Sequence, residues 1–236
     1  MSSSRGREHD ERHPPIRPVR SRDPVPARDP YGPFRVLPGA ASFRDAVPEP
    51  APLSQSVPPL GRLPTFAKDG AVHVVIETPK GSPNKYAYSE AFGAFAFKMV
   101  LPEGMSFPYD FGMVPSTKGA DGDPLDILLL LDAPAFPGCV LEARLIGVIE
   151  ADQRERDGTW GRNDRLIGVA VKARTHAHVT DLSDLRPGML DEVEAFFAQY
   201  NQLAGKDFKV RRRGDAETAL ALIRQGTDAL ELGKEA

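Results

Sequence analysis

Short apolar segments with the period of a β-strand fill the middle of the chain and limit its fold more than any other feature. In the first of them, Val72, Val74 and Ile76 alternate with other side chains, as in a strand with one buried face. Turn residues rich in Gly and Pro separate the segments, and no helical pattern intervenes. They lie at residues 71–78, 93–101, 125–131, 139–151 and 165–173. Several short strands at this spacing predict a small antiparallel, OB-like β-barrel.

Two helical patterns follow the strands. Between Pro187 and Gly205, which are typical of a helix start and a helix end, apolar side chains recur at three- and four-residue steps. These side chains are Leu190, Val193, Phe197, Tyr200 and Leu203 or Ala204. A second helix is expected to begin after an N-cap at Asp215 and to run toward Leu230. Strands followed by helices predict an α+β fold, with the barrel flanked by C-terminal helices.

The first 64 residues differ in composition from the rest. They contain 14 of the 23 prolines and 10 arginines but no lysine, and they show no apolar period. Such a segment cannot bury enough apolar surface to offset the entropy of ordering it. We therefore expect residues 1–64 to form a disordered extension and residues 65–236 to form the folded domain. The extension lacks the apolar stretch of a secretory signal, and its acidic residues disfavour a mitochondrial transit peptide.

Charge and composition argue against several classes of protein. No apolar run approaches the roughly 20 residues that cross a bilayer, so we expect no membrane partner. A formal net charge of −3 disfavours a protein that binds nucleic acid by neutralising its phosphate backbone. The single cysteine, Cys139, rules out an intramolecular disulfide and fits a reducing compartment. These features predict a cytoplasmic protein.

Three carboxylates occur within the six residues Asp121-Gly-Asp-Pro-Leu-Asp126. Gly122 and Pro124 permit a turn in which Asp121, Asp123 and Asp126 converge. Converged carboxylates repel one another, and a hard divalent cation such as Mg²⁺ compensates their charge. The alternative is that these residues only form a turn ahead of the next buried strand. The hexapeptide alone leaves both interpretations open.

Longer segments around this hexapeptide carry a family resemblance. They are VVIETPKGSPNKY, FPYDFGMVPST, DGDPLDIL, FPGCVLEARLIGVIEA and RNDRLIGVA. Together, over about residues 71–209, the chain resembles the soluble (type I) inorganic pyrophosphatase family, whose signature DGDPLD matches. The resemblance implies hydrolysis of inorganic pyrophosphate to two phosphates by a water that Mg²⁺ activates. It also implies a homo-oligomer, since bacterial members form hexamers.

The resemblance further assigns roles to single residues. It implies that Asp121 and Asp126 bind Mg²⁺, and that Asp123 lies at the metal and helps to deprotonate the attacking water. Glu77 falls where the family has a further acid near the metals, and Asn163 replaces an aspartate ligand. The residues implied to bind substrate are Lys85, Met99, Phe111, Arg165 and Tyr200.

One departure from the family pattern concerns a phosphate contact. Met99 stands where a cation normally contacts phosphate. The strand pattern predicts that Phe95, Phe97 and Met99 share one face, with Lys98 on the other. Lys98 can therefore replace the missing cation only if the strand bulges.

Other departures keep alternatives open. Asn201 follows Tyr200 where a lysine is commoner, and either Glu155 or Asp157 would complete the metal site. These changes raise the hypothesis of a drifted phosphohydrolase that acts on another phosphoanhydride, such as a nucleotide or a short polyphosphate. A third hypothesis is a catalytically weak barrel that serves as a binding module. The pair His176 and His178 is expected on a loop surface, because two ligands without a third make a weak metal site.

Overall fold

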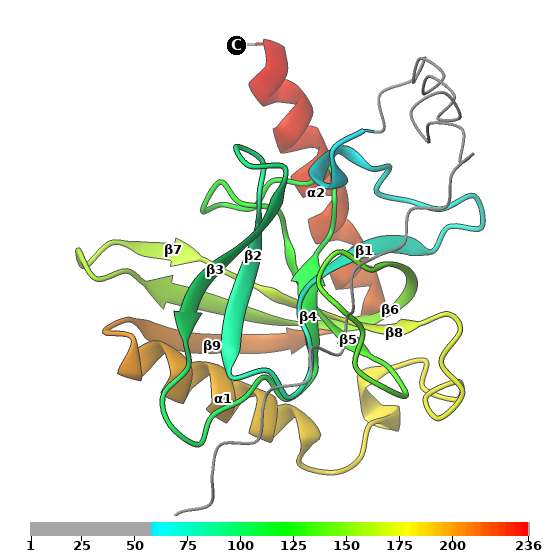
Figure 1. The fold of residues 1–236 in the computed structure, drawn as a ribbon. Helices are drawn as coiled ribbons and strands as arrows, with labels where there is room; N and C mark the ends of the chain where they lie inside the picture. The colour runs from blue at the N-terminus through cyan, green and yellow to red at the C-terminus, as the bar shows by residue number, and fades with distance from the viewer. Residues whose placement is uncertain (1–57, 236) are drawn as a thin grey trace, which may run out of the picture. The chain divides into compact units, whose positions relative to one another are not determined.

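The structure is a computed structural model that describes residues 58–235. Residues 1–57, which hold most of the predicted disordered extension, and residue 236 lie outside the described part. The strands are β1 (Val72–Thr78), β2 (Asn84–Ser89), β3 (Ala94–Val100), β4 (Asp110–Met113), β5 (Asp126–Leu130), β6 (Val140–Arg154), β7 (Trp160–Arg162), β8 (Arg165–Ala170) and β9 (Asp207–Gly214). The helices are α1 (Met189–Leu203) and α2 (Ala216–Glu235), with 3-10 turns η2 (Leu60–Arg62) and η3 (Leu182–Asp184). A sheet core followed by helices confirms the predicted α+β class (Figure 1).

The main sheet joins strands from the whole length of the described chain. Its strands lie side by side in the order β1, β4, β5, β8, β6 and β7, and β9 also pairs with β6. β1 pairs with β6 as well as with β4. In the series β1, β4, β5, β8 and β6, each strand therefore pairs with the next, and the last pairs with the first. Each of the five predicted strand segments is present, as β1, β3, β5, β6 and β8.

The prediction of a purely antiparallel sheet is wrong at one pair of strands. β5 and β8 run parallel, with Ile127 opposite Leu166 and Leu129 opposite Gly168. The long strand β6 turns back at its end, and the returning β8 pairs with β6 on one side and with β5 on the other. β8 therefore runs in the same direction as β5 and brings the start of each strand to the same end of the sheet.

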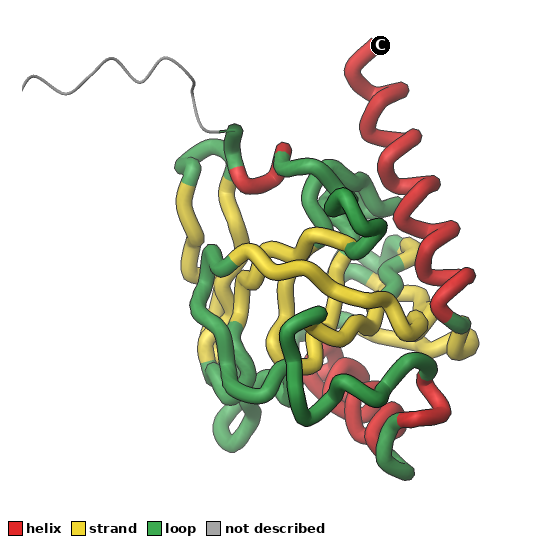
Figure 2. The backbone as a smooth tube through the Cα atoms, turned by 90° about the vertical axis from the view of Figure 1, so that its right-hand side faces the viewer, coloured by secondary structure: helices red, strands yellow, loops and turns green. Residues whose placement is uncertain are grey.

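The two helices cover the sheet on different strands. α1 packs against β9, and α2 packs against β6. Figure 2 shows the two helices in red beside the yellow strands. Phe197 of α1 and Ile223 of α2 are fully buried and join the core of the sheet. Leu203, one of the two residues predicted to continue the apolar face of α1, is 55% exposed, so the buried face of this helix ends earlier.

The helix ends follow the sequence signals. Gly188 precedes α1 in a left-handed conformation, and Gly205 follows it with a φ of 75°. The carboxylate of Asp215 accepts a 2.8 Å hydrogen bond from the backbone N–H of Thr218, as an N-cap does. The predicted N-cap of α2 is thus confirmed.

The β2–β3 hairpin forms a separate two-stranded sheet and contains a β-bulge. Lys85 pairs with Met99 and the next residue, Tyr86, pairs with Phe97, so Lys98 has no partner on β2. Neighbouring residues of β2 face opposite sides, and Phe97 and Met99 therefore lie on opposite faces. The prediction that these two residues share a face is wrong, because the bulge shifts the alternation by one residue.

Residues just before the predicted domain boundary at residue 65 contact the folded part. The backbone N–H of Ser116 donates to the carbonyl of Gly61, and its hydroxyl donates to the carbonyl of Leu63, at 2.9 and 2.8 Å. The turn η2 is thereby attached to the loop between β4 and β5. The boundary itself stays a prediction. Within the described residues, no helix is long and apolar enough to cross a membrane.

Candidate active site

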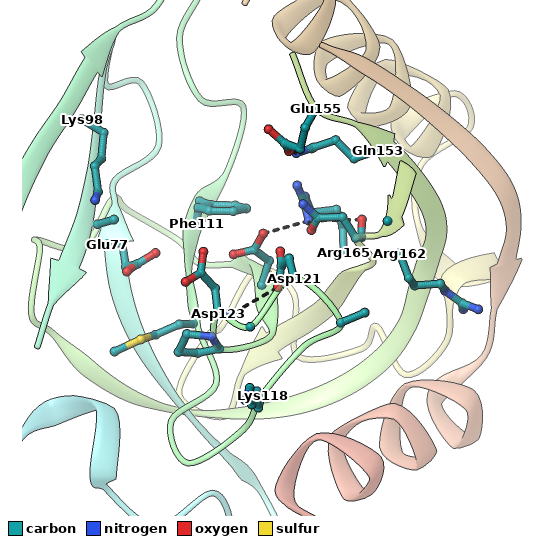
Figure 3. A pocket seen from close by; sticks show the side chains of 18 of the residues that line it. Glu77, Lys98, Phe111, Lys118, Asp121, Asp123, Gln153, Glu155, Arg162 and Arg165 are labelled. Carbon is teal, nitrogen blue, oxygen red and sulfur yellow. Dashed lines mark hydrogen bonds and ion pairs between the residues drawn. The ribbon is translucent and has the colours of Figure 1, made fainter. Parts of the chain in front are cut away.

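A cavity of about 1300 Å³ opens beside the β2–β3 hairpin. The loop before β5, the turn between β6 and β7 and the C-terminal end of α1 also line it (Figure 3). All the site residues predicted from the sequence line this one cavity. They are Glu77, Lys85, Met99, Phe111, Asp121, Asp123, Asp126, Asn163, Arg165 and Tyr200. The fold thus gathers side chains that are more than 120 positions apart in the sequence.

The acidic hexapeptide forms a compact turn at the edge of the cavity. Gly122, with a φ of 92°, donates to the carbonyl of Gly119, and Gly119 donates to the carbonyl of Asp123. A carboxylate oxygen of Asp121 accepts from the N–H of Asp123 at 3.2 Å. Asp126 begins β5, and the three carboxylates line the same cavity. The predicted turn is therefore present, and its three carboxylates line one cavity, although among the described residues they are not gathered closely enough to hold an ion.

Glu77 adds a fourth carboxylate from β1. Its side chain is nearly buried and accepts a 2.7 Å hydrogen bond from the N–H of Tyr88. Burial, reinforced by the negative charges of Asp126 and Asp123, raises the pKa of Glu77 to about 7. Burial and the same neighbouring carboxylates also raise the pKa of Asp121. Raised pKa values of this kind indicate carboxylates whose negative charge is incompletely compensated.

The donors in this part of the cavity suit Mg²⁺. The carboxylates of Glu77, Asp121, Asp123 and Asp126 and the amide of Asn163 offer oxygen ligands only, the type that Mg²⁺ prefers. Among residues 58–235, no three His, Cys, Asp or Glu side chains are already gathered closely enough to hold an ion. The carboxylates therefore surround the cavity without forming a ready-made coordination sphere. The raised pKa of Glu77 supports the fit, because a bound cation would stabilise its ionised form.

Arg165 lies between the carboxylate cluster and the aromatic core. Its guanidinium is 2.8 Å from the carboxylate of Asp126 and also donates to the amide oxygen of Asn163. The rings of Phe111 and Phe197 lie at 5.9 and 5.0 Å from its central carbon, within the range of cation–π contacts. Arg165 is thus held in place by two residues predicted to bind the metal.

The remaining predicted substrate residues line the part of the cavity wall around Tyr200. The ammonium of Lys85 lies 5.8 Å from the ring centre of Phe111 and 5.7 Å from that of Tyr200. The hydroxyl of Tyr200 donates to the sulfur of Met99 at 3.6 Å. Lys85 is therefore a cation beside aromatic faces, while Met99 gives this wall a weak acceptor in place of a charge.

The turn between β6 and β7 carries Glu155 and Asp157, the two acids that the sequence left as alternatives for the metal site. The structure places these two side chains differently. Glu155 lines the cavity, where it contacts Gln153 and Lys206 at 2.6 Å each. The contact with Lys206 lowers the pKa of Glu155. Asp157 is absent from the cavity lining and accepts from the N–H of Thr159 within its own turn. Position therefore favours Glu155 over Asp157 as the additional acid of the site.

A buried ion-pair network supports the segment that carries Asn163. Arg162 binds the carboxylates of Asp164, at 2.8 Å, and of Glu150. Asp164 also accepts from the N–H of Ala151 at 2.9 Å. Its carboxylate is thus committed to β6 and does not replace Asn163 at the large cavity, as alternation along the chain predicts.

Sequence reasoning missed several polar residues that line the cavity. These are Lys98, Lys118, Gln153, Arg162 and Lys206. Lys98 was expected to face away, and only the register of its hairpin shows otherwise. Asn201, expected where a lysine is commoner, lines the cavity, but its side-chain amide donates to the carbonyl of Phe197 at 2.9 Å.

Comparisons with known proteins agree with this geometry. The family model described as inorganic pyrophosphatase matches residues 74–231. An inorganic pyrophosphatase of a Nostoc species is 39% identical over 171 residues, which cover 72% of this chain and 98% of that protein.

Solved structures give the same result. The crystal structure of inorganic pyrophosphatase from Thermus thermophilus aligns with a TM-score of 0.68 and 35% identity, over 74% of this chain and 99% of that one. A Helicobacter pylori inorganic pyrophosphatase aligns with a TM-score of 0.63 and 30% identity, over 75% and 99%. The chain belongs to the inorganic pyrophosphatase family.

Proposed function

We propose that this protein hydrolyses inorganic pyrophosphate to two phosphates with Mg²⁺ as its cofactor. The observation that carries the proposal is that several carboxylates and several cations line one cavity. The carboxylates of Glu77, Asp121, Asp123 and Asp126 and cationic residues such as Lys85 line the same cavity. Pyrophosphate is a small, highly charged anion, so it requires both metal ions and fixed cations around it.

The carboxylates and the amide oxygen of Asn163 would hold Mg²⁺, which neutralises the substrate and acidifies a bound water. Asp123 points into the cavity from the exposed side of its turn, where its carboxylate can accept the proton of the attacking water (Figure 3). We assign it the role of general base on this position and on the family resemblance.

The cations would orient the phosphates. Lys85 projects from the hairpin beside Phe111 and Tyr200, whose aromatic rings limit how far its ammonium can move. Arg165 is committed to Asp126 and Asn163. Its first role is therefore to position those two ligands, and its contact with substrate is secondary. Phe111 is buried and serves as part of the wall.

Three finer predictions belong to this proposal. The ring of pairings from β1 through β4, β5, β8 and β6 supports the predicted small OB-like barrel. The family resemblance supports a homo-oligomer, with a hexamer as the specific expectation. The single cysteine supports a cytoplasmic location.

Of the alternatives, the drifted phosphohydrolase predicts a preference for another phosphoanhydride, and the binding module predicts no turnover. The relatives named above are pyrophosphatases, and the acidic cluster is intact, so neither alternative is favoured.

A phosphate-release assay with pyrophosphate, triphosphate and ATP tests the proposal. With Mg²⁺ present we expect pyrophosphate to give the highest kcat/KM, and excess chelator to abolish release. A preference for ATP or triphosphate would favour the drifted phosphohydrolase, and the absence of release from all three would favour the binding module.

A further inference from the structure

The bulge in the β2–β3 hairpin changes which side chains of β3 face the cavity. In a regular strand, Lys98 and Met99 would point to opposite sides. Because Lys85 pairs with Met99 and Tyr86 pairs with Phe97, Lys98 is the inserted residue. Bulges of this kind redirect a side chain and are common beside active sites. Lys98 and Met99 both line the cavity, whereas Phe97 is 58% exposed and does not.

The two neighbours differ in what they offer an anion. The sulfur of Met99 accepts from the hydroxyl of Tyr200 at 3.6 Å, so this side chain packs against α1 and provides no donor. Lys98 provides a full positive charge on a flexible stem. Figure 3 shows its side chain extending from β3 toward the part of the cavity where Glu77 lies.

Lys98 is also available to a ligand, unlike Lys206 and Arg165 of the same cavity. Lys206 lies 2.6 Å from Glu155, and Arg165 lies 2.8 Å from Asp126. Lys98 forms no ion pair with any other residue between 58 and 235. Among the described residues, this ammonium therefore has no carboxylate partner, although several carboxylates line the cavity.

We propose that Lys98 binds a phosphate group of the substrate and supplies the positive charge that Met99 lacks. This inference rests on the proposed pyrophosphatase function. Lys85 pairs with Met99, the residue that follows Lys98, so both lysines lie at the bulge of one hairpin and line the same cavity. Two ammonium groups at the bulge would bind oxygens of a single phosphate, and Mg²⁺ would remain with the carboxylates. A surface lysine of no function is the alternative, and it predicts no effect on substrate binding.

The test compares Lys98→Gln with Lys172→Gln, which removes an exposed lysine outside the cavity lining. A charge-assisted hydrogen bond is worth about 1.5–3 kcal/mol, so Lys98→Gln is expected to raise KM for Mg-pyrophosphate roughly tenfold or more. Lys172→Gln should leave KM unchanged. Lys98→Arg should keep most of the affinity, because the charge is retained.

A rescue variant separates binding from a structural effect on the hairpin. Adding Met99→Arg to Lys98→Gln restores a cation at the neighbouring cavity position, and we expect it to recover most of the lost affinity. A merely disturbed bulge would not be repaired by a larger charged residue beside it.

A binding measurement keeps this inference separate from the proposed function. Titration with the non-hydrolysable analogue methylenediphosphonate in the presence of Mg²⁺ reports affinity without turnover. Weaker binding by Lys98→Gln than by Lys172→Gln supports the role of Lys98, even if the wild-type protein fails to hydrolyse pyrophosphate. Equal affinities of these two variants for methylenediphosphonate would overturn it, whatever the activity of the wild type.

Discussion

Arg165 of β8 binds Asp126 of β5 at 2.8 Å and thereby joins the starts of two parallel strands at the floor of the cavity. The guanidinium also donates to Asn163, which lies two residues before it. One buried cation therefore sets the position of two predicted oxygen ligands from distant parts of the sequence.

Replacing Arg165 by Met should destabilise the protein by about 3 kcal/mol, because it leaves the partly buried carboxylate of Asp126 without its partner. Urea denaturation of the metal-free protein measures this loss. Arg174→Met is a suitable control, since the pair with Asp132 is 3.8 Å long and the Arg174 side chain is 93% exposed. Such surface pairs contribute about 0–1 kcal/mol. Equal effects of the two variants would contradict the structural role of Arg165.

Glu77 should make the stability of the metal-free protein depend on pH. Its pKa of about 7 in the folded protein lies above the ordinary value of 4.5. The folded state therefore holds the proton more tightly, and this contribution is complete below pH 4.5 and is lost as pH rises through 7. Relative to Glu77→Gln, the wild type should lose up to about 3 kcal/mol over this window.

Denaturation of both proteins at several pH values, without metal, tests the dependence on Glu77. Glu142→Gln, which removes an exposed carboxylate of β6, serves as the control. Added Mg²⁺ should stabilise the wild type more at pH 8 than at pH 6, since the cation requires ionised ligands. A wild type whose pH profile is parallel to that of Glu77→Gln would show that burial of Glu77 has no such effect.

Glu155 and Asp157 should differ in their effect on Mg²⁺. Glu155 lines the cavity and Asp157 does not. Glu155→Gln is therefore expected to weaken Mg²⁺ binding several-fold, by removing one nearby negative charge, while Asp157→Asn leaves it unchanged. Calorimetric titration with Mg²⁺ measures both. A larger loss of Mg²⁺ affinity in Asp157→Asn than in Glu155→Gln would instead favour Asp157 as the additional acid of the site.

Gly112 of β4 should tolerate no side chain. A Cβ at this position would overlap the backbone carbonyl of Val75 on the neighbouring strand β1. Because the obstacle is backbone, Gly112→Ala is expected to cost more than about 3 kcal/mol or to prevent folding. Gly161→Ala is the matched control, since a Cβ there has no atom within 4 Å. Thermal melting of the two variants measures the difference.

Strong apolar alternation predicted the main strands, but shorter or charged strands escaped it. β4 has only four residues, and β9 carries Arg211, Arg212 and Arg213. These arginines pair with acids of β6 and α1, as with Asp152 at 2.6 Å. Such pairs form only in the folded protein, so local hydrophobicity gave no sign of this strand. The parallel pair β5–β8 likewise depends on long-range pairing that no local pattern encodes.

The residues of the candidate site were predicted on a different basis. An ordered set of motifs identified Asp121, Asp123 and Asp126, and the structure places them in one cavity. Lys98 could not be found in this way, because its orientation follows from an inserted residue in the hairpin pairing. The direction in which the Lys98 side chain points depends on how β2 and β3 pair and not on its residue type.

The most direct test of the proposed chemistry is the kcat for phosphate release from Mg-pyrophosphate by Asp123→Asn. The exposed Asp228→Asn on α2 is its control. Removal of a general base lowers rates by about 10²–10⁴-fold. The account predicts a loss of at least about 100-fold for Asp123→Asn, with wild-type thermal stability and an unchanged kcat for Asp228→Asn. A wild-type kcat in Asp123→Asn would contradict it.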